Sequence, residues 1–289
     1  MSTIPSVKEL FKAGAHYGHR RNRTDARAHK FVFTYRNKVA VIDLEKTREG
    51  LEKALEFLAE QAKEGATVLF VGTKVQAKET VRQLAESLKQ PYIVERWPGG
   101  LLTNYEEVSK AIKRMLKTET DLAENKFDSL TKKERLMIEK DLKKKQNIFG
   151  GLRYLSKKPD IVIVVDAKEE EIAVAEANIS GAKVIGICDT NANPRNIDYP
   201  IPANDDSKKA LEMILALIAD AISKNFKSKV IPTEAEVTKR VEKAIKKENA
   251  GVAPTEEEIA AVDKPIKVEA GKDKPKKGIG DGKNKKAKK

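Results

Sequence analysis

Short, nearly continuous apolar runs alternate along the chain with longer stretches in which apolar residues recur every three or four positions. The runs predict strands at 31–35, 39–44, 67–72, 92–95, 160–166 and 183–189. The helical spacing covers 5–13, 47–64, 74–89, 170–179 and 206–223. Because apolar strands separated by helices are typically buried on both sides, the pattern favours a mostly parallel sheet flanked by helices. The predicted fold class is therefore α/β and doubly wound.

Residues 104–149 interrupt this alternation and hold 12 basic and nine acidic residues. Their apolar positions follow a narrow seam, formed by Val108, Ile112, Met115 and Leu122 in the first half and by Ile138, Leu142 and Phe149 in the second. Thr131 and Glu134 have the spacing of a capping box, so the second helix begins there. A narrow seam between charged faces predicts a coiled-coil helical hairpin that projects from the body. The alternative is two surface helices packed flat on the sheet.

Charge is unevenly distributed along the 289 residues, whose formal net charge is +13. Residues 264–289 hold 11 Lys, three acidic residues and few apolar ones, so we expect a disordered tail that either solubilises the chain or binds nucleic acid. The predicted organisation is an α/β body at 1–103 plus 150–225, the hairpin at 104–149, a charged helical extension at 226–263 and the tail at 264–289.

A second basic region lies at the other end of the chain, where residues 1–40 hold nine basic and two acidic residues. Arginine presents a planar fork to phosphate oxygens, and imidazole or aromatic rings offer stacking surfaces for bases, so this mixture favours RNA recognition. A solvated loop of mixed charge is the alternative. The candidate RNA-binding residues are His16, His19, Arg20, Arg21, Arg23, Arg27, Lys30, Arg36, Lys74, Arg96, Trp97 and Asn104.

The chain lacks the residues that several other classes of function require. A single cysteine, Cys188, excludes a disulfide framework and a cysteine-based zinc site. The chain has neither an apolar run of membrane-spanning length nor an apolar leader, so we expect no membrane partner and a cytoplasmic location. Doubly wound folds often bind nucleotides, but no G-x-G-x-x-G follows a strand, and VGTK at 71–74 lacks the P-loop spacing. We therefore expect no cofactor, no small-molecule substrate and no enzymatic activity, with a nucleotide-binding enzyme or sensor as the alternative.

Two local features, a possible metal site and the single tryptophan, each have two interpretations. His19, Asp189 and Asp205 are weak candidates for a metal site, because all three are expected at the strand-end edge of the sheet; Asp205 is equally explained as a residue that opens a helix. Trp97 joins the sheet to the hairpin beside a Gly pair. It either fixes the angle of the hairpin or stacks on a base, and the first reading is favoured slightly.

Six motifs occur along the chain in the same order as in a known protein family. They are KAGAHYGHR at 12–20, NKVAVIDLEKT at 37–47, LFVGTK at 69–74, RWPGGLLTN at 96–104, PDIVIVVDA at 159–167 and DTNANP at 189–194. Together they resemble the bacterial ribosomal protein S-two family over residues 5–225. The segment Thr24–Ala28 departs from the family, which usually carries an aromatic residue and an Asn-Pro-Lys-Met-like stretch there.

The resemblance implies an α/β fold with a protruding coiled-coil hairpin and a structural, non-enzymatic role in the small (30S) ribosomal subunit. It also implies binding to the 16S rRNA at the head–body junction, contacts with other small-subunit proteins, and help in docking ribosomal protein S-one near the mRNA exit. The resemblance says little about the chain beyond residue 225. A pure protein–protein adaptor acting through the hairpin is compatible with this role.

Overall fold

The computed structural model describes residues 4–225 of the chain. The predicted helical extension at 226–263 and the Lys-rich tail at 264–289 lie outside the described residues. Between residues 4 and 225, no helix combines the length and apolar character needed to cross a membrane. The division of the chain into domains remains a prediction.

The centre of the fold is a five-stranded parallel sheet in the order β5-β4-β6-β7-β8. Its strands are β4 (Val68–Val71), β5 (Tyr92–Ile93), β6 (Ile161–Val165), β7 (Lys183–Cys188) and β8 (Tyr199–Pro202). The chain leaves β4 toward β5 on one side, and it leaves β6 toward β7 on the other. The carboxyl ends of β4 and β6 therefore form the topological switch point, where doubly wound proteins place their ligand sites.

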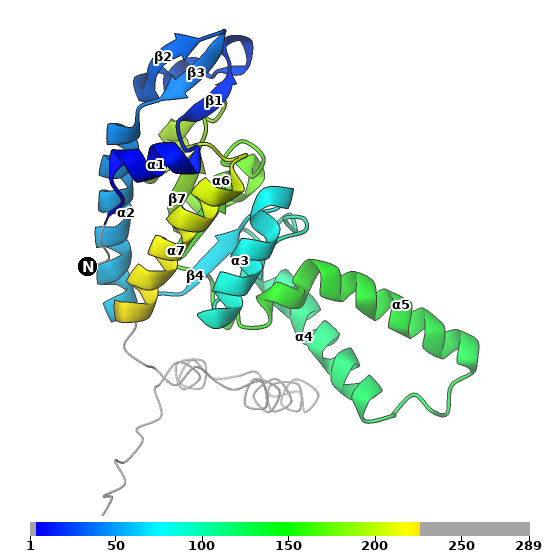
Figure 1. The fold of residues 1–289 in the computed structure, drawn as a ribbon. Helices are drawn as coiled ribbons and strands as arrows, with labels where there is room; N and C mark the ends of the chain where they lie inside the picture. The colour runs from blue at the N-terminus through cyan, green and yellow to red at the C-terminus, as the bar shows by residue number, and fades with distance from the viewer. Residues whose placement is uncertain (1–3, 226–289) are drawn as a thin grey trace, which may run out of the picture. The chain divides into compact units, whose positions relative to one another are not determined.

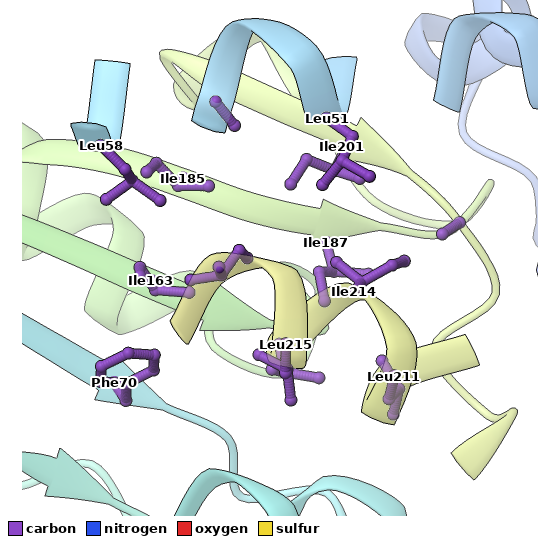
Figure 2. Close-up of a cluster of buried hydrophobic side chains, with 14 of the residues drawn as sticks. Leu51, Leu58, Phe70, Ile163, Ile185, Ile187, Ile201, Leu211, Ile214 and Leu215 are labelled. Carbon is purple, nitrogen blue, oxygen red and sulfur yellow. The ribbon is translucent and has the colours of Figure 1, made fainter. Parts of the chain in front are cut away.

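Helices cover both faces of this sheet, as the sequence predicted. The helices α1 (Val7–Ala13), α2 (Leu44–Glu64), α3 (Val75–Ser87) and α7 (Lys208–Asn225) contribute to one apolar cluster, and α6 (Glu171–Ser180) contributes to a second. Alternate residues of one strand face different clusters: Ile163 belongs to the first, and Val162 and Val164 belong to the second. Figure 2 shows side chains of the first cluster, in which Leu51 of α2 and Leu215 of α7 join apolar side chains of the strands, such as Ile163.

A separate antiparallel sheet lies near the N-terminus, with the order β1-β3-β2. It consists of β1 (Tyr17–Arg20), β2 (Val32–Arg36) and β3 (Val39–Ile42), with two short 3₁₀ helices, η1 (Arg21–Arg23) and η2 (Ala26–Phe31), between β1 and β2. The tight turn between β2 and β3 has positive φ angles at Asn37 and Lys38, 50° and 65°, as two-residue hairpin turns require. The sequence predicted β2 and β3 but not their separation from the parallel sheet.

Residues 104–149 form two helices, α4 (Tyr105–Ala123) and α5 (Lys132–Phe149), which pack against each other (Figure 1). The predicted capping box is confirmed: the Thr131 hydroxyl accepts from the Glu134 backbone N–H, and the Glu134 carboxylate accepts from the Thr131 N–H. Ile112, Met115 and Leu142 are the buried residues of the pair. The coiled-coil character of this hairpin stays a prediction.

Candidate nucleic-acid interface

A buried ion-pair network occupies the edge of the sheet that includes the switch point. The Lys74 ammonium, which precedes α3, lies 2.6 Å from Asp205 Oδ1, 2.7 Å from Asp206 Oδ1 and 3.3 Å from Asp166 Oδ2. Asp166 follows β6, and Asp205 and Asp206 follow β8. The Lys74 side chain is only 17% exposed and that of Asp205 is fully buried. One cation of the chain thus neutralises carboxylates that follow two different strands.

The electrostatics of this network are set by burial and by the unequal number of charges. Burial alone would lower the pKa of Lys74, but its bonds to Asp205 and Asp206 outweigh that effect and raise it. Burial, together with the negative charges of Asp166 and Asp189, raises the pKa of Asp205 to about 7. Asp205 Oδ2 has no hydrogen-bond partner. The single lysine therefore stabilises the cluster without fully compensating it.

Two hydrogen bonds to Glu170 hold the loop between β4 and α3. Thr73 donates both its backbone N–H (3.1 Å) and its hydroxyl (2.5 Å) to Glu170 Oε1, from the loop before α6. Burial raises the pKa of the Glu170 carboxyl above its ordinary value. The groups that a nucleotide would need at this edge, a backbone N–H and a lysine, are thus engaged by carboxylates of the chain itself.

His19 joins the N-terminal sheet to the end of β7. Its Nδ1 lies 2.9 Å from Asp189 Oδ2, and its backbone N–H donates to the Thr190 hydroxyl at 2.9 Å. The Asp189 bond raises the pKa of His19. Asp205, the third weak metal candidate, bonds to Lys74 instead. Within residues 4–225, no group of three or more His, Cys, Asp or Glu side chains is placed to hold a metal ion.

Six of the predicted RNA-binding cations are exposed around the N-terminal sheet. We call them the N-terminal basic surface: Arg20, Arg21, Arg23, Arg27, Lys30 and Arg36. Arg21 lies 5.3 Å from the centre of the Tyr35 ring, and Arg27 makes a two-pronged bond with Asp25, at 2.9 and 2.7 Å. This bond lowers the pKa of Asp25 to about 2. The four basic side chains of the two 3₁₀ helices are thus all exposed, and Arg21 and Arg27 are held in place by Tyr35 and Asp25.

Three other predicted RNA-binding residues are covered by the protein. His16 is 8% exposed and its ring stacks on Phe11, with the ring centres 4.1 Å apart. Trp97 is also 8% exposed, and Lys74 is held in its ion-pair network. Arg96 and Asn104 are exposed, but they lie in the segment before α4. We therefore leave His16, Lys74 and Trp97 out of the proposed interface, because burial denies RNA access to their side chains.

The indole of Trp97 instead anchors the segment that leads into the hairpin. Trp97 Nε1 and the Gly100 N–H donate to Glu176 Oε1 at 3.0 and 2.8 Å, and the Leu102 N–H donates to Glu176 Oε2 at 3.0 Å. Thr103 donates to the same Oε2 through its backbone N–H and its hydroxyl. Burial would raise the pKa of Glu176, but these bonds lower it. This arrangement favours the structural alternative for Trp97.

The sequence patterns did not single out Glu176 or the exposed rings of Phe11 and Phe33. Glu176 is one of two glutamates of α6, and no local pattern sets it apart; the one signal was the indole N–H of Trp97, which needs an acceptor when it is buried. Tyr17 and Phe33 are 59% and 74% exposed on the small sheet, and Phe11 is 58% exposed on α1. The run at 31–35 predicted a strand but not which of its side chains face the solvent; Phe33 lies at a solvent-facing position of the small antiparallel sheet.

Comparison with known proteins identifies the family. A model of the family described as "Ribosomal protein S2" matches residues 10–225. A relative from Dictyoglomus thermophilum, named "Small ribosomal subunit protein uS2", is 44% identical over 216 residues, which are 75% of this chain and 88% of that protein. Relatives of the same name from Parabacteroides distasonis and Salinibacter ruber are 40% and 39% identical, over 84% and 79% of this chain and 88% and 72% of their own lengths. These names describe a ribosomal constituent rather than an enzyme.

Proposed function

The chain belongs to the ribosomal protein S2 family of the small ribosomal subunit, and from this premise we propose that it binds the 16S rRNA through the N-terminal basic surface. The observation that carries the proposal is the exposure of six cationic side chains on one small substructure. Cations of this kind displace counterions from phosphates, and arginine adds two-pronged bonds to phosphate oxygens. We also propose a cytoplasmic, ribosome-bound location.

The fold supports a rigid rather than a hinged basic surface. The Asp25 N–H donates to the Thr190 carbonyl at 2.8 Å, and His19 bonds to Asp189 and Thr190, so both ends of η1 are fixed to the loop after β7. A surface held in place loses little conformational freedom on binding, which favours affinity.

The rRNA proposal is tested by neutralising the arginines of β1 and η1. We expect the full chain with Arg20→Gln, Arg21→Gln and Arg23→Gln to bind transcribed 16S rRNA at least about tenfold more weakly at 0.15 M salt. The slope of log affinity against log salt should fall by about two to three, because three phosphate contacts are lost. The matched control is Lys53→Gln, Lys63→Gln and Lys209→Gln, which removes the same charge from exposed positions on α2 and α7. Equal binding by both triple variants would contradict the proposal.

We further propose that the chain helps to dock ribosomal protein S-one. The exposed rings of Tyr17 and Phe33 support this, because aromatic residues are enriched in protein interfaces and are costly to leave in water. In a binding assay with purified S-one, Phe33→Ser should weaken capture at least about tenfold. An unchanged affinity, with the fold intact by circular dichroism, would remove Phe33 from the docking surface.

A further inference from the structure

The two helices of the hairpin differ sharply in charge. The helix α4 holds four basic and four acidic residues, whereas α5 holds seven basic and three acidic ones. The imbalance is therefore confined to one helix of the pair. None of the α5 residues belongs to the N-terminal basic surface or to the segment that Glu176 anchors.

Most of the basic residues of α5 are not engaged by carboxylates. Arg135 pairs with Asp128 and Glu139, and Lys145 pairs with Asp141. Among the ion pairs of the described residues, none involves the remaining lysines, and all of these are exposed: Lys132, Lys133, Lys140, Lys143 and Lys144. Their charge is therefore available to a partner.

The helical spacing places three of these lysines on one face. At 100° per residue, Lys133, Lys140 and Lys144 lie roughly 160–180° around the helix from Leu142, the buried residue of α5. The face opposite the α4–α5 seam therefore carries a row of positive charges about 16 Å long, at 1.5 Å per residue. Met137, which is 62% exposed, lies between the first two lysines of the row.

We infer that the row of Lys133, Lys140 and Lys144 on α5 is a second RNA-binding surface, which takes the phosphate backbone of rRNA. This inference rests on the proposed rRNA-binding function. A repeated row of ammonium groups matches a regular chain of phosphates, and lysine binds phosphate as a point charge. Protein partners fit the row less well, because lysine is depleted in protein interfaces and each buried ammonium must lose its water.

The test uses the full chain and transcribed 16S rRNA. We expect Lys133→Gln, Lys140→Gln and Lys144→Gln together to lower the affinity at 0.15 M salt about tenfold and to reduce the salt slope by about two to three. Glutamine has nearly the same helix propensity as lysine, so α5 should stay folded. The control is again the triple variant at Lys53, Lys63 and Lys209. Hydroxyl-radical footprints should lose protection at nucleotides other than those lost with the N-terminal arginine variant.

The outcomes distinguish a failure of this inference from a failure of the proposed rRNA-binding function on which it rests. If the wild-type chain does not bind 16S rRNA, or the arginine variant binds normally, the proposed function fails. If both of these behave as proposed and the α5 variant matches the control variant in affinity and slope, only the α5 surface is refuted. An α5 variant that binds free rRNA normally but no longer joins assembled subunits would also overturn the inference, in favour of an acidic protein partner.

Discussion

Glu176 offers the sharpest test of how the hairpin is attached to the sheet. Replacing it with glutamine keeps the size of the side chain but exchanges one acceptor oxygen for an N–H₂ group. Oε1 accepts from Trp97 and Gly100, and Oε2 accepts from Leu102 and Thr103. Whichever way the amide turns, at least two donors of the segment before α4 then face a donor.

The magnitude follows from these bonds. A hydrogen bond to a charged acceptor contributes about 1.5–3 kcal/mol, and a buried donor left unpaired costs a similar amount. Two donors lost in a site that is 7% exposed should lower the free energy of unfolding by about 3–6 kcal/mol. For a domain of about 200 residues this corresponds to a fall in Tm of about 6–24 °C.

Urea unfolding followed by circular dichroism measures the change, with Glu171→Gln as the control. Glu171 lies on the same helix, but its side chain is 73% exposed and, within residues 4–225, it forms an ion pair with the exposed Lys168, so its loss should cost less than about 0.5 kcal/mol. A Glu176→Gln variant within about 0.5 kcal/mol of wild type would refute the reasoning.

The pH dependence gives the same reasoning a second readout. Because folding lowers the pKa of Glu176, the carboxylate stabilises the fold above its ordinary pKa of 4.5. This stability is lost as the pH falls through the lower folded pKa. The difference in stability between wild type and Glu176→Gln should therefore shrink on acidification.

Three further predictions concern the sheet edge and the hairpin base. Lys74→Met should lower the free energy of unfolding by about 3–5 kcal/mol in urea, because it leaves buried carboxylates unpaired, and adding Asp205→Asn should recover part of the loss. In wild type, the bond to Asp189 raises the pKa of His19, so the protonated imidazole stabilises the fold. This stabilisation is fully present below about pH 6.5 and is lost as the pH rises through the folded pKa; His19→Gln should abolish this pH dependence in unfolding curves at pH 5–9. Gly151→Ala should lower the Tm, because its Cβ would clash with the Tyr92 carbonyl oxygen. Gly150→Ala meets nothing within 4 Å and should leave the Tm unchanged or raise it.

Much of the fold was predictable because its signals are local. Continuous apolar runs gave the buried strands β4, β6 and β7, and the capping box at Thr131 gave the start of α5. The strand β8 was missed because two of its four residues are proline, which is tolerated at an edge strand but argues against a strand in sequence. The strand β1 was missed because its YGHR sequence lacks an apolar run, and its pairing with β3 is a long-range contact.

The site was predictable only in part, because residue type predicts charge but not burial. The arginines of β1 and η1 are exposed, as expected of guanidinium groups without a nearby core. His16 and Trp97 have the same chemistry as RNA-stacking residues, yet both are buried: Phe11 stacks on His16, and the Trp97 indole donates to the Glu176 carboxylate. Lys74 is held by carboxylates that are more than 90 residues away in sequence, and no local pattern reveals such pairings.

Lys74, at the switch point, also determines whether the stability of the fold depends on a ligand. In a doubly wound protein that binds a free ligand at this edge, stability rises with the ligand's concentration. Here the neutralising cation belongs to the same chain, in the loop between β4 and α3, so its effective concentration beside Asp166 and Asp205 is fixed by folding alone. This part of the sheet therefore reaches its full stability at any metabolite level, which suits a protein that is made to become one component of a larger particle.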